Sequence, residues 1–264
     1  MAATPRSDSS GLVQSVDRAA QLLGILADVG VGRVTDLAER IQTHKSTVSR
    51  LLATLEAHGL VAQDPDTAAY RLGQGVVRLA GAVPHAFDLG AASRPIAVQL
   101  ARQVRETVNL VVLDGTHTMC VDQVLGNASV TTVNWLGKRS PTHLAASGKA
   151  LLAAMDPVDL SSHLCDPLGG PTPASITDRS ILDAHLRLVR ERGWADSIDE
   201  QEAGLTSVAA SIRDRDGTVV AALAVSGPSF RMSGEHLERI GRTTAAAAAR
   251  ISRHTGQART AGDA

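Results

Sequence analysis

The sequence predicts an α+β protein with two parts of different character, residues 12–73 and residues 94–255. Two observations lead to this prediction. The first part repeats apolar residues at helical spacing and ends in one short hairpin, whereas the second mixes strands and helices without regular alternation. A chain of 264 residues is long enough for two hydrophobic cores, and an aromatic content of 2% leaves Ala, Val and Leu to fill them.

Three helices and a hairpin make up the first part. Helical spacing predicts helices over residues 13–27, 35–41 and 44–58. The first helix is expected to stop near Gly30, Thr35 is the expected N-cap of the second, and Gly59 follows the third where a C-cap glycine belongs. Extended runs at 60–63 and 70–72 flank the turn "DPDT" and predict a small hairpin.

A linker separates the two parts. Residues 75–82 continue a helical pattern that Pro84 ends or kinks, so we assign residues 74–93 to a linker helix. The next helix, over residues 94–106, has Pro95 in its first turn, where proline is tolerated.

The second part is expected to contain several strands, three helices and no internal repeat. Asp114 and Gly115 form the turn between its first two strands, and Asp216 with Gly217 is the expected two-residue loop of a longer hairpin. Thr177 is the expected cap of one helix, which Gly193 stops. The predicted strands lie within residues 107–115, 119–126, 129–137 and 206–227, and the predicted helices cover 145–155, 177–193 and 234–254.

Composition and the two ends of the chain limit the class of protein. The net charge is −1, and residues 1–73 hold seven Lys or Arg against eight Asp or Glu, so attraction to a polyanion must come from local placement. Residues 1–11 and 256–264 are expected to be disordered tails, without the apolar core of a signal peptide. Cys120 and Cys165 have no CxxC or other metal-like spacing and form no disulfide framework, which agrees with a reducing cytoplasm. No apolar run reaches the roughly 18 residues that span a bilayer, so no membrane contact is expected.

The third helix has an unusual polar face. Its apolar side chains would bury one side, and between Glu39 and Glu56 the sequence contains no acid. The polar face therefore offers only hydroxyl donors and positive charge, from Lys45, Ser46, Thr47, Ser49 and Arg50. An ordinary amphipathic helix would also show a solvated polar face. However, a preceding helix, a short turn and a following hairpin are the layout of a winged helix-turn-helix, which places such a helix in the DNA major groove.

Two residues outside the third helix are further candidates for DNA contact. Arg71 in the hairpin would reach phosphate from the wing, and the alternative is an ordinary charged strand residue. Thr35 would touch phosphate at a helix N-terminus, with capping as the alternative.

Longer stretches of the chain resemble one family. "VQSVDRAAQLLGILA" and "VTDLAERIQTHKSTVSRLLATLEAHGLVAQDPDTAAYRLG" are similar to the N-terminal domain of IclR-type (isocitrate lyase regulator) bacterial transcription factors. The resemblance continues in "RSPTHLAASGKALLA", in "RERGWADSIDEQEAGLTSVAASIRDRDGTVVAALAVSGP" and in the closing helix, covering about residues 12–255. It implies a winged helix-turn-helix domain, a linker helix and a C-terminal effector-binding domain of GAF-like fold with an antiparallel sheet. It also implies dimers or tetramers, palindromic operators and control by a small organic effector.

The chain departs from the family pattern at two places. The family often has Gly-Leu-Pro before its Lys-Ser-Thr, where this chain has Gln42, Thr43 and His44. A Thr-Gly-Glu-Thr motif of the family is replaced by residues 104–107, so that Arg105 stands where a helix-ending glycine is usual.

The predicted long hairpin has one face of small residues. A two-residue loop at Asp216 and Gly217 sets Ser207 opposite Ser226, with both side chains on one face. Alanines and a further serine share that face, while the opposite face is bulky and suited to packing on helices. A face of small residues either leaves a cavity with hydroxyl groups in it or receives a helix closely, and the hairpin alone does not decide between the two.

The family resemblance implies where the effector would bind. It points to the turn before the Gly-Lys helix, at Ala146 and Ser147, and to the positions of Ser197, Ser207 and Ser226. Met119 and Leu136 are further candidates, with a plain core position as the alternative. Backbone amides that open a helix suit an anionic or carbonyl oxygen, so the hypothesis is a small carboxylate or other polar metabolite.

Enzyme motifs are incomplete. "SGKA" lacks the first glycine and the final Ser or Thr of a phosphate-binding loop, and no GxSxG elbow occurs. His143 with Cys165 is the one pair weighed as a zinc site, and isolated His and Cys are usually structural. We therefore expect a DNA-binding regulator without catalysis, cofactor or metal. The alternative is a ligand-binding interaction protein that has lost DNA binding, and the effector, the regulated genes, repression or activation, and dimer or tetramer stay open.

Overall fold

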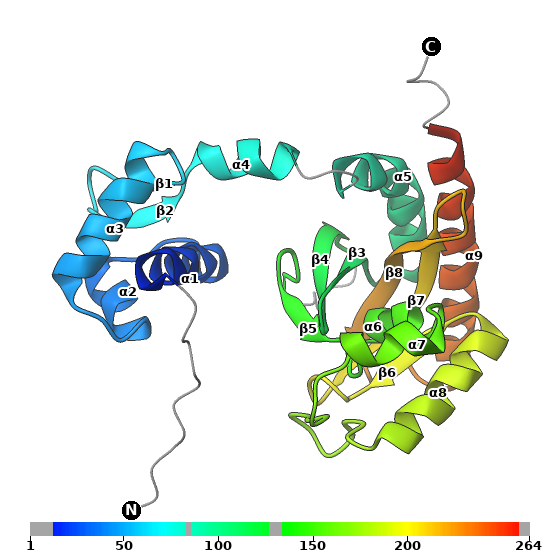
Figure 1. Ribbon diagram of the computed structural model, residues 1–264. Helices are drawn as coiled ribbons and strands as arrows, with labels where there is room; N and C mark the ends of the chain where they lie inside the picture. Colours follow the sequence, from blue (N-terminus) through cyan, green and yellow to red (C-terminus); the bar gives the residue numbers. More distant parts are fainter. Residues whose placement is uncertain (1–12, 83–85, 127–133, 259–264) are drawn as a thin grey trace, which may run out of the picture. The chain divides into compact units, whose positions relative to one another are not determined.

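The computed structural model describes residues 13–82, 86–126 and 134–258 (Figure 1). The chain divides into two compact units, Met1–Pro84 and His85–Ala264, and each is described by itself. The tail predicted for residues 1–11 and most of the strand predicted over 129–137 lie outside the described residues. Within the described ranges, no helix combines the length and the apolar character that crossing a membrane requires.

The N-terminal unit contains the three helices and the hairpin that the sequence predicts. Its elements in chain order are α1 (Gln14–Val29), α2 (Val34–Arg40), α3 (Lys45–Ala57), β1 (Val61–Gln63), β2 (Tyr70–Leu72) and α4 (Gln74–Gly81). The turn between the antiparallel strands begins at Asp64, whose carboxylate accepts hydrogen bonds from the amides of Asp66 and Thr67. One hydrophobic cluster joins the helices to the hairpin, and Val48, Leu52 and Leu55 supply the part that comes from α3.

Two predicted helix caps are wrong by one residue or more. Thr35 does not cap α2, because the helix starts earlier, with the Leu37 amide bonded to the Arg33 carbonyl at 3.0 Å. Thr177 does not cap its helix either. Asp178 does, accepting hydrogen bonds from the amides of Ser180 and Ile181.

The C-terminal unit is one antiparallel sheet of six strands in the order β5-β4-β3-β8-β7-β6 with helices on both faces (Figure 1). Its strands are β3 (Thr107–Asp114), β4 (His117–Val124), β5 (Arg139–Pro141), β6 (Ala195–Ile198), β7 (Leu205–Arg213) and β8 (Val219–Pro228). Its helices are α5 (Ala86–Val104), α6 (Ala146–Ala153), α7 (Pro157–Leu160), a 3-10 turn η1 (Ser161–His163), α8 (Arg179–Arg192) and α9 (Gly234–Ala258).

Helix α5 starts earlier than the sequence suggests. It begins at Ala86 and keeps Pro95 inside the helix instead of in its first turn, because packing continues upstream of the proline. Leu89 lies seven residues before Ile96, on the other side of Pro95, and both side chains are buried in one hydrophobic cluster. The residues from 86 to 93, assigned above to a linker, therefore belong to the first helix of the second unit. Similarly, α9 extends to Ala258, into the tail predicted from residue 256.

The two faces of the sheet differ as the hairpin pattern predicts. The bulky face of β7 and β8, with Val208, Leu223 and Val225, packs against α5 and α9. The small face receives α6, whose Ala146 and Ala150 join the cluster of Ala209 and Ala224. Gly148 of α6 packs on the turn that precedes the helix, since a Cβ there would lie 2.2 Å from the carbonyl oxygen of Thr142.

The predicted register of the long hairpin is correct, although its loop is not. Ser207 lies opposite Ser226. The loop spans five residues between Arg213 and Val219 instead of two, with the Asp214 carboxylate bonded to the Thr218 amide at 2.9 Å. The register of the two strands shifts by one residue between Ile212 and Arg213. Because of this shift, the residues beyond it pair as they would if the loop had two residues.

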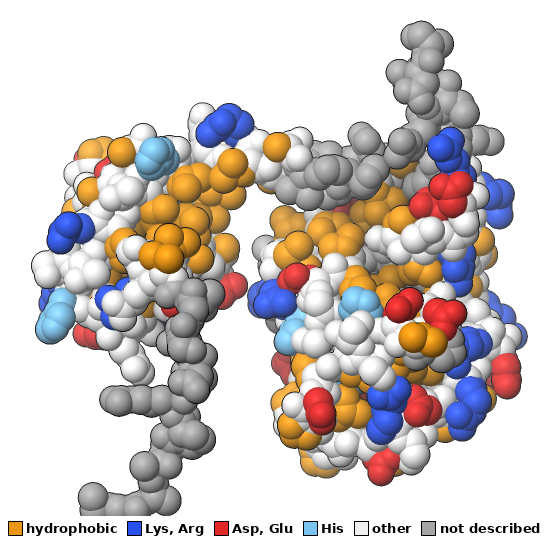
Figure 2. All heavy atoms as spheres, viewed as in Figure 1, with side chains coloured by type: hydrophobic (Ala, Val, Ile, Leu, Met, Phe, Trp, Pro, Cys, Tyr) orange, Lys and Arg blue, Asp and Glu red, His pale blue; other side chains and the backbone are white. Residues whose placement is uncertain are grey.

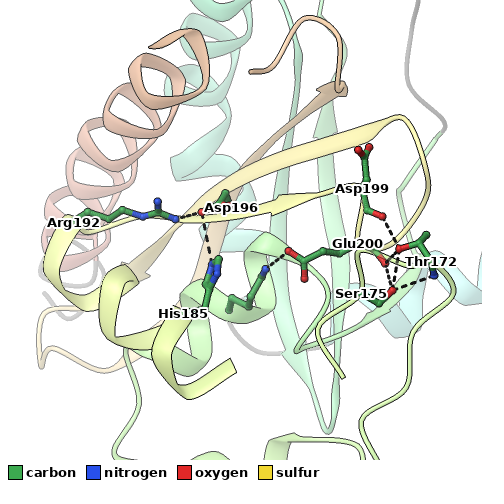
Figure 3. Close-up of polar contacts among 8 residues, drawn as sticks. Thr172, Ser175, His185, Arg192, Asp196, Asp199 and Glu200 are labelled. Carbon is green, nitrogen blue, oxygen red and sulfur yellow. Dashed lines mark hydrogen bonds and ion pairs between the residues drawn. The ribbon is translucent and has the colours of Figure 1, made fainter. Parts of the chain in front are cut away.

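A buried ion pair joins α6 to the segment that follows β6 (Figure 3). Lys149 Nζ lies 2.6 Å from Glu200 Oε1, with the lysine side chain 0% and the glutamate side chain 7% exposed. Burial lowers the pKa of Lys149 and raises the pKa of Glu200, and the charge of each partner opposes that shift. The pair fixes the start of α6 relative to the β6–β7 connection.

Further polar contacts surround this ion pair (Figure 3). The hydroxyl of Thr172 donates to the Asp199 carbonyl, and the hydroxyl of Ser175 donates to the Glu200 carbonyl, each at 2.7 Å. On the α8 side, burial and the charges of Lys149 and Arg192 lower the pKa of His185 to about 3, so its ring is neutral near pH 7. The hydrogen bonds of Thr172 and Ser175 hold the β6–β7 connection in place.

Both family glycines that this chain lacks fall at residues with positive φ. Gln42 has φ 50° and Arg105, directly after α5, has φ 63°. A side chain with a Cβ is strained in this region, whereas glycine is not.

Arg105→Gly is therefore expected to raise the free energy of unfolding by about 1 kcal/mol. Both tryptophans of the chain, at 135 and 194, lie in the C-terminal unit, so their fluorescence during urea unfolding reports on that unit.

Gln103→Gly is the matched control, because Gln103 is exposed and helical two residues earlier in α5. This variant should lower the free energy of unfolding by about 1 kcal/mol. If Arg105→Gly and Gln103→Gly both lower the free energy of unfolding, the backbone at Arg105 is not strained.

Lys149→Met should lower the free energy of unfolding of the C-terminal unit by about 3–5 kcal/mol, because it leaves the Glu200 carboxylate buried without its partner. Adding Glu200→Met should recover most of that loss, because the double variant buries no charge at this place. If the double variant is as unstable as Lys149→Met, the loss comes from changed side-chain packing and not from an unpaired buried charge. Urea unfolding followed by tryptophan fluorescence measures both variants.

Candidate functional site

The N-terminal unit presents the polar face of α3 to solvent. Lys45, Ser46, Ser49 and Arg50 are exposed, and Thr47 is partly buried. Among the described residues, neither Lys45 nor Arg50 forms an ion pair within 4.0 Å. Figure 2 shows Lys and Arg side chains reaching the surface where Figure 1 places α3. The burial of Val48 and Leu52 on the opposite side turns these polar groups outward.

A groove lies at the start of α3, with a volume of about 870 Å³. It brings together Thr35, Lys45 and Ser46, three of the residues that the sequence singles out. Six further residues line it that the sequence does not mark as DNA contacts, namely Arg18, Ala38, Glu39, Gln42, Thr43 and His44. Arg18 comes from α1, and no local pattern in the sequence shows that α1 reaches this groove.

The N-terminus of α3 has no side-chain cap. His44 is the N-cap residue, and its ring makes no capping hydrogen bond. The first amides of a helix lack partners within the helix, and they carry partial positive charge. The first turn contains no acid, so these amides and Lys45 form one electropositive end that suits a phosphate oxygen.

The two candidates outside α3 have contacts of their own. Arg71 is exposed on β2, where it pairs with Ala62 of β1, and its charge contributes to lowering the pKa of Asp64, after the hydrogen bonds from Thr67. The hydroxyl of Thr35 donates to the Asp36 carboxylate at 3.0 Å.

The C-terminal unit contains a narrow pocket between the small face of the sheet and the start of α6. Four of the predicted effector residues line it, namely Ala146, Ser147, Ser207 and Ser226. The remaining lining residues are Asn109, Val111, Thr118, Cys120, Trp135, Lys138, Ser140, Ala145, Gln201, Leu205 and Ala224. Its volume is about 40 Å³, which is on the order of one or two water molecules.

Three predicted effector residues do not line the pocket. Met119 lies between Thr118 and Cys120, and because alternate residues of a strand point to opposite faces, it faces away from the pocket. Leu136 is 54% exposed. Ser197 is buried on β6 opposite Ser207, one strand further from the pocket.

Neutral hydrogen-bonding groups form the floor of the pocket. The Asn109 amide donates to the Ser226 hydroxyl at 3.4 Å and accepts from the side chain of Gln123 at 3.0 Å. Burial raises the pKa of the Cys120 thiol to about 12, so this sulfur stays protonated. A protonated thiol is a weak donor and a poor nucleophile, which suits binding and not covalent chemistry.

His143 and Cys165, the pair considered for zinc, have no further ligands gathered around them in the described part of the chain. Nowhere in the described ranges do three His, Cys, Asp or Glu side chains converge as a metal would require. His143 instead bonds through Nε2 to the Gly169 carbonyl at 2.7 Å, and burial lowers the pKa of its ring.

Comparison with known proteins agrees with this arrangement. A family model described as the bacterial transcriptional regulator IclR C-terminal matches residues 81–253, and the IclR helix-turn-helix domain matches residues 15–65. The HTH-type transcriptional regulator Rv1719 of Mycobacterium tuberculosis is 36% identical over 244 residues, which cover 91% of this chain and 92% of the relative.

Two further relatives extend the comparison. The HTH-type transcriptional repressor AllR of Escherichia coli is 31% identical over 222 residues, covering 83% of this chain and 82% of the relative. The crystal structure of an IclR transcriptional regulator from Alicyclobacillus acidocaldarius superposes with a TM-score of 0.78 at 28% identity, covering 93% of this chain and 100% of that chain. The chain therefore belongs to the IclR family of bacterial transcriptional regulators.

Proposed function

We propose that α3 reads the major groove of an operator and that a small organic effector in the pocket of the C-terminal unit changes this binding. The observation that carries the proposal is the exposed face of α3, where Lys45 and Arg50 have no ionic partner among the described residues. Cations left bare on a helix at the surface suit phosphates, and the hydroxyls of Ser46 and Ser49 suit base edges.

We further propose that copies of this chain associate, as a dimer or tetramer, to bind a palindromic operator. The N-terminal unit exposes hydrophobic side chains next to its DNA-contacting elements, which supports an interface between copies. Val13 and Val16 at the start of α1 are 66% and 65% exposed, and Val77 and Leu79 on α4 are 69% and 52% exposed. Figure 2 shows hydrophobic side chains gathered over α1. Two-fold symmetry of a protein is mirrored in its DNA site.

The proposed mechanism is thermodynamic linkage. An effector that prefers one arrangement of the paired units changes their affinity for DNA. DNA must then change the affinity for the effector by the same factor. The pocket supports a small carboxylate or another polar metabolite, because neutral donors and one lysine line it. The proposed role is non-catalytic and cytoplasmic, with no cofactor.

Arg50→Ala is expected to weaken binding to the DNA upstream of the protein's own gene by about tenfold, while the free energy of unfolding stays within about 0.5 kcal/mol. The plot of log Kd against log salt concentration should also become shallower by about one unit if Arg50 contacts phosphate. Fluorescence anisotropy with labelled duplex measures both quantities.

Arg253→Ala is the matched control, because it removes the same charge from an exposed position on α9. This variant should bind DNA as the unchanged protein does. Unchanged DNA binding in Arg50→Ala would contradict a phosphate contact by Arg50. Failure of the unchanged protein to bind duplex at low salt would favour a ligand-binding interaction protein that has lost DNA binding.

Ser226→Ala is expected to uncouple the effector from DNA. The variant loses the hydroxyl that Asn109 contacts in the pocket but leaves α3 untouched. DNA affinity without ligand should therefore be unchanged, whereas the shift that a pocket ligand produces, typically about 5–150-fold in such systems, should shrink. Titration of DNA at several concentrations of small carboxylates measures the shift. Equal shifts in both proteins would place the effector elsewhere.

A further inference from the structure

The charge of the pocket lining is uneven. Lys138 is the one charged side chain among the described residues that line the pocket, and no carboxylate lies among them. Lys138 is exposed, and within the part of the chain that the structure describes it forms no ion pair within 4.0 Å. A single unpaired cation therefore stands at a pocket whose other polar groups are neutral.

Trp135 supplies a second, independent signal. Its indole Nε1–H is shielded from solvent and has no hydrogen-bond partner. Buried donors are nearly always paired in folded proteins, so an unpaired donor in a pocket points to an acceptor that belongs there. The Lys138 ammonium lies 5.6 Å from the centre of the indole ring, within the range of a cation–π contact.

The turn that carries both residues is held against the sheet. The Lys138 amide donates to the Trp135 carbonyl at 2.9 Å, which closes the turn. The Gly137 amide donates to the Cys120 carbonyl at 2.8 Å, and the Cys120 amide donates to the Lys138 carbonyl at 3.2 Å. Since Cys120 itself lines the pocket, these bonds place Trp135 and Lys138 at its edge.

We propose that Trp135 and Lys138 select effectors that carry one negative charge, a carboxylate monoanion. The indole N–H would donate to one carboxylate oxygen, and the Lys138 ammonium would neutralise the charge. This inference rests on the proposed function only in treating the pocket as the effector site. One lysine matches one charge, whereas a phosphate dianion would keep an uncompensated charge beside neutral groups.

The size of the pocket adds a consequence. A volume of about 40 Å³ admits little more than the carboxylate itself, so the body of a ligand must displace the side chains at the edge. Binding should therefore change the surroundings of Trp135. The other tryptophan, Trp194, is 5% exposed and lies under the Arg192 guanidinium at 3.7 Å, away from the pocket lining.

The test uses the full chain without DNA and two pairs of probes that differ in charge but hardly in shape. These are propanoate with propanamide and benzoate with benzamide, and inorganic phosphate is a fifth probe. Calorimetry measures each affinity, and tryptophan fluorescence measures the change at the pocket. We expect at least one carboxylate to bind about tenfold or more tightly than its amide, and phosphate to bind more weakly than that carboxylate.

Lys138→Gln should remove most of the preference for the carboxylate over the amide and leave the affinity for the amide unchanged. Trp135→Phe should remove the fluorescence response and weaken the carboxylate a few-fold. Arg139→Gln is the matched control, because Arg139 adjoins Lys138 but pairs with Asp114 at 2.6 Å and does not line the pocket. The control should keep the full preference.

Several results would overturn the inference. They are the absence of binding by both carboxylates, equal affinities for carboxylate and amide, or a preference that survives Lys138→Gln. Selective carboxylate binding that leaves DNA affinity unchanged would instead support the inference and contradict effector control of the operator, so the two proposals fail separately.

Discussion

The one-sided burial of α3 is the constraint on which the DNA-binding account depends. Val48 and Leu52 are fully buried against the other helices and the hairpin, and a regular helix then has no freedom to choose which residues face outward. Lys45 and Arg50 are exposed for this reason, and the next acid of the helix is Glu56, near its end. A chain with a net charge of −1 thus keeps a local cationic surface.

A similar division of faces shapes the C-terminal unit. Bulky residues on one side of the β7–β8 hairpin pack on long helices, and small residues on the other side let α6 approach. Both outcomes that a small-residue face allows are realised, since Ala209 and Ala224 contact the helix while Ser207 and Ser226 line the pocket. The ion pair of Lys149 and Glu200 lies two residues from Ser147 and one from Gln201. It therefore fixes the distance between two walls of the pocket.

The sequence predicts features that depend on neighbours along the chain. The order of the elements follows from periodicity, and the opposition of Ser207 and Ser226 follows from the alternation of strand residues about the Asp216–Gly217 turn. It does not predict features that depend on distant segments. Pro95 is a poor marker for the start of α5, because packing of Leu89 and Ile96 outweighs one lost hydrogen bond.

The pocket shows the same limit. Asn109, Trp135 and Lys138 come from a strand and a turn that meet α6 only in the folded sheet, so no local pattern in the sequence associates them with Ser147. Met119 shows the opposite error, because strand alternation places its side chain on the other face. Arg18 likewise joins the groove at α3 from a helix whose sequence resembles any amphipathic helix.

Methylation interference on the DNA upstream of the protein's own gene tests the central claim most directly. Methylation of guanine N7 lies in the major groove, where the face of α3 is proposed to dock. The account predicts interference at two half-sites whose centres lie about one helical turn apart, or a multiple of it, because paired copies place two α3 helices on one side of the duplex. Binding that tolerates methylation throughout the major groove would contradict it.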